Sequence, residues 1–257
     1  MRQTKGRELE MTKYTAYTTY TTYTPAPSPA ALSSTSRMAA ILAALCAALS
    51  ISALATLHVL SPELDTTWRM VSEYALGHYG WVLSLMFLTM GLGCVALVIA
   101  IMPQMRTRGG KVGLALLLLA CVGMAMASVF DITQGMHGLA ALIGNTSFPA
   151  AAILISVSLS RANPAWASVR RLLLWTGNLP WVSVVAMLAF LFVGLSQTGG
   201  KFGPGVWIGW PNRILWVAYG AWVMVVAVRV ARMSRSQKRS HPTPDASGAN
   251  DTSVTAA

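Results

Sequence analysis

The sequence predicts an all-α membrane protein, a six-helix transmembrane bundle with both ends of the chain in the cytoplasm. Of its 257 residues, 54% are hydrophobic and only 11% are charged, whereas charged residues make up about 25% of a soluble domain. The apolar residues gather in six runs, each near the roughly 20 residues that a helix needs to cross the hydrocarbon core. Strands are excluded, because an open sheet edge in lipid would leave backbone groups unpaired.

Three regions follow from this pattern. Residues 1–37 repeat tyrosine among threonines and then proline, which predicts a disordered cytoplasmic arm. Residues 38–232 form the transmembrane domain, and the polar residues 233–257 are predicted to be a disordered cytoplasmic tail. The six predicted spans are Met38–Leu60, Trp81–Met102, Val112–Phe130, His137–Leu159, Leu172–Leu195 and Ile214–Val230.

The positions of the cationic residues predict the orientation. Of the 19 Lys and Arg residues, only Arg69, Lys201 and Arg213 fall in the first, third and fifth loops; the others lie in the two tails and in the second and fourth loops. Positive residues accumulate on the cytoplasmic side, so both termini are predicted there, in the cell membrane. The net charge of +11 therefore indicates membrane topology, and no nucleic-acid partner is predicted.

The first outer loop has a pattern of its own. Ser61 and Pro62 are typical of a helix start, and Gly77 is typical of a helix end. Apolar residues recur between them at helical spacing, while Asp65, Arg69 and Glu73 recur every fourth residue on another face. We expect a short amphipathic helix at the membrane surface. It is either a solvated charged face or a lid over a polar cavity among the spans.

Unusual residues for a membrane domain collect on the same predicted side. Asp131 and His137 bracket the turn between the third and fourth spans, and Arg213 opens the sixth. Such groups can pair or snorkel to water, or they can line a ligand site. Pro149 and Pro180 lie at similar depth in two spans, which predicts either kinked packing or a widened cavity.

A family resemblance adds to this reading. The stretch Ser72-Glu73-Tyr74-Ala75-Leu76-Gly77, followed by Tyr79-Gly80-Trp81, resembles the hallmark of the DUF998 family of bacterial six-span membrane proteins of unknown function. Asp131, His137-Gly138 and Asn212-Arg213 also resemble positions where that family carries polar residues. The resemblance covers roughly residues 38–232 and implies a fold, with no activity attached.

The function that these residues favour is binding of a small polar ligand or lipid headgroup in an outward-facing polar pocket. The candidate ligand-binding residues are Arg69, Glu73, Tyr74, His78, Asp131, His137 and Arg213. A guanidinium donates two parallel hydrogen bonds to phosphate or carboxylate. The expected partners are therefore membrane lipids and a small anion or lipid headgroup; no oligomeric state is predicted.

Three alternatives stay open. A structural or assembly partner without a ligand would use small residues such as Gly91 and Gly93 for close helix packing. A metal-assisted hydrolase would need the histidines and carboxylates to converge, yet no HExxH motif is present. A haem carrier would need paired histidines from facing spans. No cofactor or metal is predicted, and an enzyme is not the favoured interpretation.

Overall fold

A computed structural model of the chain describes residues 33–162 and 164–240. These residues form six long helices and contain no strand: α2 Ser34–Leu60, α3 Gly80–Ile101, α4 Arg108–Val129, α5 Gly135–Ala162, α6 Arg170–Gln197 and α7 Gly209–Ser240. Three short 3-10 helices lie in the connections: η2 Val71–Leu76, η3 Met102–Gln104 and η4 Pro164–Val169. Each of the six predicted spans lies almost entirely within one long helix, so the predicted bundle is confirmed.

The surface of the bundle is that of a membrane protein. All six helices are long and apolar enough to cross a membrane, with mean hydropathy between 1.6 and 2.5 over the 18 most apolar consecutive residues of each. Large apolar side chains also point outward along the helices, among them Leu45, Leu92, Trp175 and Phe192. Water would oppose such exposure, whereas lipid tails do not. The chain is therefore a multi-pass integral membrane protein.

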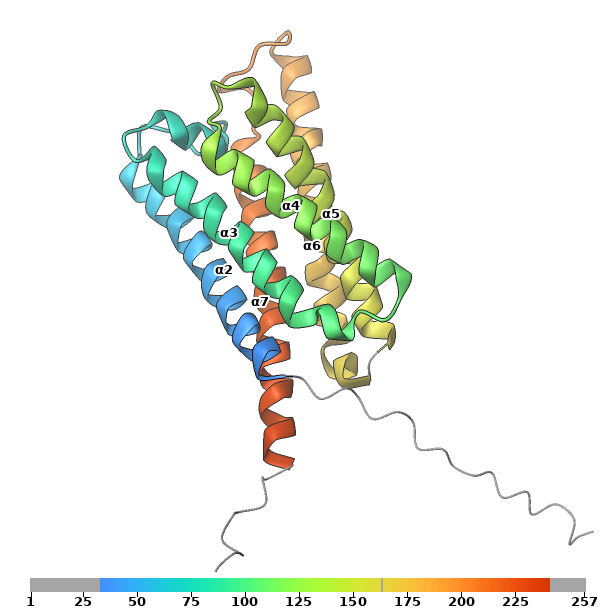
Figure 1. Cartoon of the computed structure of the whole chain (residues 1–257). Coiled ribbons are helices and arrows are strands. Elements are labelled where there is room, and N and C mark those ends of the chain that lie inside the picture. The colour runs from blue at the N-terminus through green and yellow to red at the C-terminus, as the bar shows by residue number, and fades with distance from the viewer. Residues whose placement is uncertain (1–32, 163, 241–257) are drawn as a thin grey trace, which may run out of the picture.

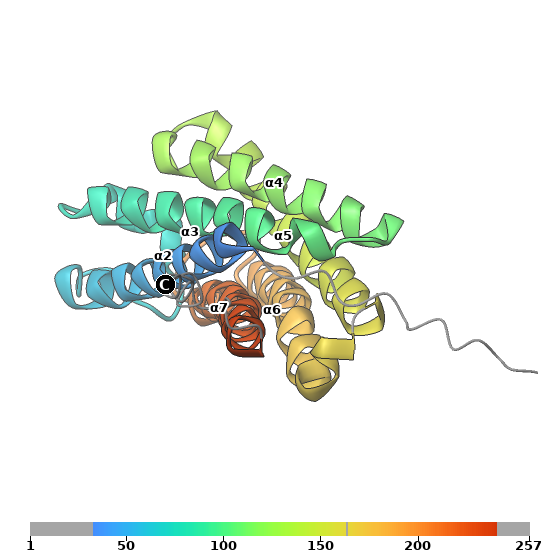
Figure 2. The same cartoon turned by 60° about the horizontal axis from the view of Figure 1, so that its bottom comes forward.

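The six helices pack as a closed ring in chain order, α2 against α3, then α4, α5, α6 and α7, with α7 returning to α2. α3 also contacts α7 across the ring. Figure 1 shows that the start of α2 and the end of α7 lie at the same end of the bundle, and Figure 2 shows the helices with that end turned forward. We call this the Arg229 end and the opposite one the Arg213 end.

The helix boundaries extend beyond the predicted ones. Ser33 caps α2 by accepting a hydrogen bond from Ser36 N at 3.1 Å, so the helix begins four residues before Met38. α7 continues to Ser240, eight residues past the predicted end of the domain at residue 232. Most of the predicted arm and tail, residues 1–32 and 241–257, lie outside the described residues.

The first loop differs from the predicted amphipathic helix. Residues 62–68 form turns, and helical structure is limited to the 3-10 helix η2. The Asp65 carboxylate accepts from the backbone N–H and the hydroxyl of Thr67, which favours a local turn. Further on, Arg69 O and Val71 N bond to Arg213 and Asn212 of α7. Tertiary partners have therefore replaced the hydrogen bonds that an α-helix would make.

Pro149 and Pro180 both lie inside continuous helices, α5 and α6. Polar side chains near them fold back onto their own helix. Thr146 donates to Leu142 O at 2.8 Å, and Asn178 donates to Leu174 O at 2.7 Å. Such bonds hide a polar group from lipid.

Candidate functional site

Two adjoining features occupy the Arg213 end of the bundle. The first is a cluster of hydrogen bonds around the buried guanidinium of Arg213, which we call the Arg213 clasp; it consists of His58, Thr66, Arg69, Tyr74, Gly209 and Arg213. The second is a cavity between α3, α4, α5, α6 and α7, which we call the polar cavity. Residues 69–74 of the first loop contribute to both.

Arg213 is only 3% exposed, and its guanidinium is bonded by neutral groups. Nη1 donates to Arg69 O at 2.7 Å and to Gly209 O at 2.9 Å, and Nη2 donates to the Tyr74 hydroxyl at 3.0 Å. Hydrogen bonds from a charged group contribute about 1.5–3 kcal/mol each, which offsets part of the cost of burying the cation. Arg213 therefore holds the first loop onto the start of α7.

His58, in the last turn of α2, completes the clasp. Its Nε2 accepts from Arg213 Nε at 2.9 Å, and its Nδ1 lies 2.7 Å from Leu54 O. A carbonyl can only accept and a guanidinium can only donate. His58 is therefore the neutral tautomer with its proton on Nδ1. The clasp thus ties α2, the first loop and α7 together.

Arg69 and Glu73 form the ion pair of this region, and Asp65 takes no part in it. Arg69 Nη1 lies 3.4 Å from Glu73 Oε2, and the Glu73 side chain is mostly buried. The Arg69 guanidinium also lies over the Trp68 ring. The Asp65 carboxylate bonds to Thr67 and not to Arg69. The hydrogen bonds from the backbone N–H and the hydroxyl of Thr67 hold the pKa of Asp65 below its ordinary value.

The structure separates the other predicted site residues from this clasp. Asp131 accepts from the hydroxyl of Thr133 at 2.5 Å and from its backbone N–H at 2.8 Å, and these bonds lower the pKa of Asp131. His78 is exposed, with its ring edge-on to Tyr79. His137 donates through Nδ1 to Phe130 O at 2.8 Å and lines the polar cavity.

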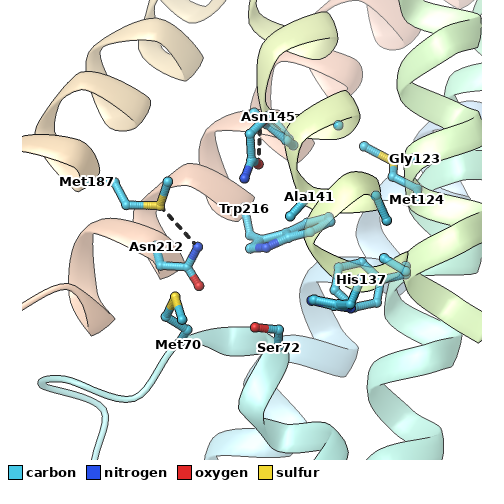
Figure 3. A pocket seen from close by; sticks show the side chains of 15 residues that line it. Met70, Ser72, Gly123, Met124, His137, Ala141, Asn145, Met187, Asn212 and Trp216 are labelled. Carbon is cyan, nitrogen blue, oxygen red and sulfur yellow. Dashed lines mark hydrogen bonds between the residues drawn. The ribbon is translucent and has the colours of Figure 1, made fainter. Parts of the chain in front are cut away.

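The polar cavity encloses about 110 Å³. Figure 3 shows its lining, which is Met70, Ser72, Phe87, Gly123, Met124, Ala127, His137, Ala140, Ala141, Gly144, Asn145, Met187, Asn212, Trp216 and Tyr219. Most of these side chains are apolar. The hydrogen-bonding groups come from Ser72, His137, Asn145, Asn212 and Tyr219. Among the described residues, no Asp, Glu, Lys or Arg lines the cavity.

Asn212 has a poorly matched partner. Its Oδ1 accepts from Val71 N at 2.8 Å, but its Nδ2 donates to the thioether sulfur of Met187 at 3.4 Å. A thioether is a weak acceptor, and Asn212 is 9% exposed. The amide therefore has donor capacity that the described residues satisfy only weakly.

Glycines of α4 and α5 line the polar cavity, and aromatic residues border it on one side. A side chain at Gly123 would strike the backbone of α5, so α4 and α5 approach closely there, while a Cβ at Gly144 would meet nothing within 4 Å. On the side toward the Arg229 end, Phe148 stacks on Tyr219 with ring centroids 3.9 Å apart. Trp222 packs edge-on to Phe148 and donates to Ser156 Oγ at 2.9 Å. We call Phe148, Tyr219 and Trp222 the aromatic layer.

Five hydrogen-bonding side chains outside the seven candidates thus belong to these features: His58, Ser72, Asn145, Asn212 and Tyr219. A histidine in the last turn of a span and an asparagine beside a membrane arginine were the available signals. In the described part of the chain, no three His, Cys, Asp or Glu side chains gather as a metal site would require. The geometry thus offers hydrogen bonds to a small uncharged group, together with apolar contact.

The comparisons with known proteins agree with the fold. Neither the search of curated proteins nor the search of solved structures finds a significant match. A family model described as a protein of unknown function matches residues 44–229, which cover α3, α4, α5 and α6 completely and most of α2 and α7. This match takes in both the Arg213 clasp and the polar cavity, and the chain belongs to the DUF998 family.

Proposed function

We propose that this membrane protein binds a small, uncharged polar group in the polar cavity, such as the hydroxyl or ester end of a neutral amphiphile. The observation that carries the proposal is the lining itself. Five helices surround a space with apolar walls and a few neutral hydrogen-bonding groups, which is the usual composition of a small-molecule site.

The chemistry of the lining favours a neutral ligand over an anion. The guanidinium of Arg213 already donates to acceptors of the protein, and the Arg69 side chain pairs with Glu73. In the cavity, Asn212 Nδ2 offers a donor and the Ser72 hydroxyl offers a donor or an acceptor. His137 uses Nδ1 on Phe130 O, which leaves Nε2 for a hydrogen bond with a ligand.

The size of the cavity limits what enters it. A volume of about 110 Å³ is near that of an engineered protein cavity of about 150 Å³ that binds benzene. It is well below the 300–1,000 Å³ of drug-sized sites. The bound part is therefore a few heavy atoms, and an attached chain would extend beyond the cavity into the bilayer.

The test uses monoolein, a neutral lipid with a glycerol end, added to the purified protein in detergent. We expect monoolein to raise the midpoint of thermal unfolding more than oleate does. Gly144→Val should abolish this shift, because Gly144 lines the cavity and an added Cβ there meets nothing within 4 Å, which leaves room for the new side chain in the space of the ligand.

Gly138→Val is the matched control on the same helix, since Gly138 is exposed, does not line the cavity and has no atom within 4 Å of an added Cβ. Both variants make the same change in helix propensity. A monoolein shift that survives in Gly144→Val, or one that disappears equally in Gly138→Val, contradicts the proposal. Gly144→Ala serves if the valine variant does not fold.

We also propose that the protein lies in the cell membrane with both termini in the cytoplasm. The support is the distribution of cations. Arg106, Arg108, Arg170, Arg171 and Arg229 all flank the Arg229 end of the bundle, whereas Arg69, Lys201 and Arg213 are at the Arg213 end. The positive-inside rule then directs the Arg229 end inward, and the polar cavity would open toward the outer side.

A further inference from the structure

A second depression lies on the outside of the bundle, near the Arg229 end, between α2 and α7. It encloses about 230 Å³ and is lined by Ala40, Ile41, Ala44, Leu45, Ala227, Val228, Ala231 and Arg232. The polar cavity lies near the other end of the bundle and shares no residue with it. We call this depression the α2–α7 groove.

The wall of the groove suits a hydrocarbon chain. Its floor is made of alanines, of which Ala40 and Ala227 are fully buried, and its edges are Leu45 and Val228, both well exposed. Small residues on two facing helices leave a shallow channel, and larger apolar side chains on the edges give it walls. Because the edges face outward along membrane-spanning helices, the natural occupant of the channel is lipid.

Cations lie where the channel reaches the end of the bundle. Arg232 lines the groove and is exposed. Arg37 lies one turn before Ala40 and Ile41, on the same face of α2. The Nε atom of Arg37 is buried and has no hydrogen-bond partner among the described residues. That N–H group is left for an acceptor from outside the described residues.

The described residues place no carboxylate at this end of the bundle. The acidic residues in the described range are Glu63, Asp65, Glu73 and Asp131, and all four belong to loops at the Arg213 end. An Arg guanidinium binds phosphate well, and cations at the membrane surface attract anionic lipids. The positive charge of the arginines and the apolar channel beside them therefore both favour an anionic lipid.

We propose that the α2–α7 groove is a binding site for one anionic phospholipid, with an acyl chain along the alanine floor and the phosphate held by Arg37 and Arg232. The site is independent of the function proposed for the polar cavity, and it requires no particular orientation in the membrane.

The experiment measures binding of phosphatidylglycerol and of phosphatidylcholine with identical chains to the full-length protein, by native mass spectrometry. The wild-type protein should bind phosphatidylglycerol in preference, with a first molecule held more tightly than later ones. In Arg37→Gln/Arg232→Gln we expect the affinity for that first molecule to fall roughly tenfold or more. Binding of phosphatidylcholine should not change.

The control is Arg106→Gln/Arg108→Gln, which removes the same charge from the same end of the bundle but beside α3 and α4. It should keep the tight first site. Equal loss in both double variants would mean that only diffuse charge acts, and it would overturn the proposal, as would an unchanged first site in the Arg37/Arg232 variant. If that variant does not fold, Ala44→Leu, which fills the groove and keeps both cations, must weaken the first site.

Discussion

The hydrogen bond from Arg213 determines which nitrogen of His58 carries the proton. The guanidinium of Arg213 is buried among carbonyls, a hydroxyl and an imidazole, with no carboxylate bonded to it. His58 supports this arrangement only while its Nε2 carries a lone pair, because the same atom would repel Arg213 if it carried a proton. The neutral imidazole is thus part of what makes a buried cation tolerable here.

Substitutions at position 58 test this role. His58→Gln can still offer an oxygen to Arg213 Nε, whereas His58→Leu leaves a buried charged donor unsatisfied. We expect the leucine variant to unfold more easily than the glutamine variant by about 1.5–3 kcal/mol, the usual contribution of a hydrogen bond to a charged group. Thermal unfolding of both proteins in the same detergent measures the difference, and equal midpoints would rule out this account of His58.

The first loop shows how an element takes its shape from its neighbours. Gly209 N donates to Thr67 O at 3.0 Å, and a Cβ at Gly209 would overlap Thr66 O. The loop therefore rests directly on the start of α7, where it also meets Arg213 and Asn212. This close contact requires the absence of a side chain at position 209.

Gly209→Ala should push the first loop away from α7. We expect a loss of about 1–3 kcal/mol in stability, which is typical of overpacking, and faster trypsin cleavage after Arg69. Gly203→Ala is the control from the neighbouring loop, where an added Cβ meets nothing within 4 Å. Unchanged cleavage in the Gly209 variant would show that the loop does not depend on this contact.

The spans could be predicted from the sequence because crossing a bilayer is a matter of length and hydropathy, which any window of residues carries. The amphipathic helix expected from Ser61 to Gly77 was too long, since the hydrogen bond from Arg213 to Arg69 O and the one from Val71 N to Asn212 Oδ1 compete with helical ones. Periodicity within a segment holds no information about such distant partners.

The same limit applies to the site. Residues such as Arg69, Tyr74 and Arg213 stand out by type, and the structure does join them. Asp131 stands out equally, yet it is bonded within its own turn to Thr133. The polar cavity depends on Gly123, Ala140 and Gly144, which are common residues in membrane helices and attract no notice in a sequence.

At the scale of the whole molecule, the ring of helices separates two chemically different ends. The described acidic residues are all at the Arg213 end, and most of the described cations are at the Arg229 end. This polarity is the basis for the proposed orientation, because the membrane potential and the insertion machinery both act on cationic flanks.

Reporter fusions test the orientation directly. Green fluorescent protein at the C-terminus should fluoresce, and alkaline phosphatase at the same position should be inactive. Alkaline phosphatase inserted after Lys201, in the loop that precedes α7, should be active. The reverse pattern would mean that the Arg213 end faces the cytoplasm.

The aromatic layer bears on how a ligand could move from the polar cavity along the bundle. Phe148 of α5 is almost completely buried, as are Tyr219 and Trp222 of α7, and its ring packs against both of theirs. Moving these rings apart would disrupt the stacking of Phe148 on Tyr219 and the hydrogen bond from Trp222 to Ser156. A ligand bound in the polar cavity as proposed would therefore meet these rings on the side toward the Arg229 end, and we expect it to enter and leave at the Arg213 end.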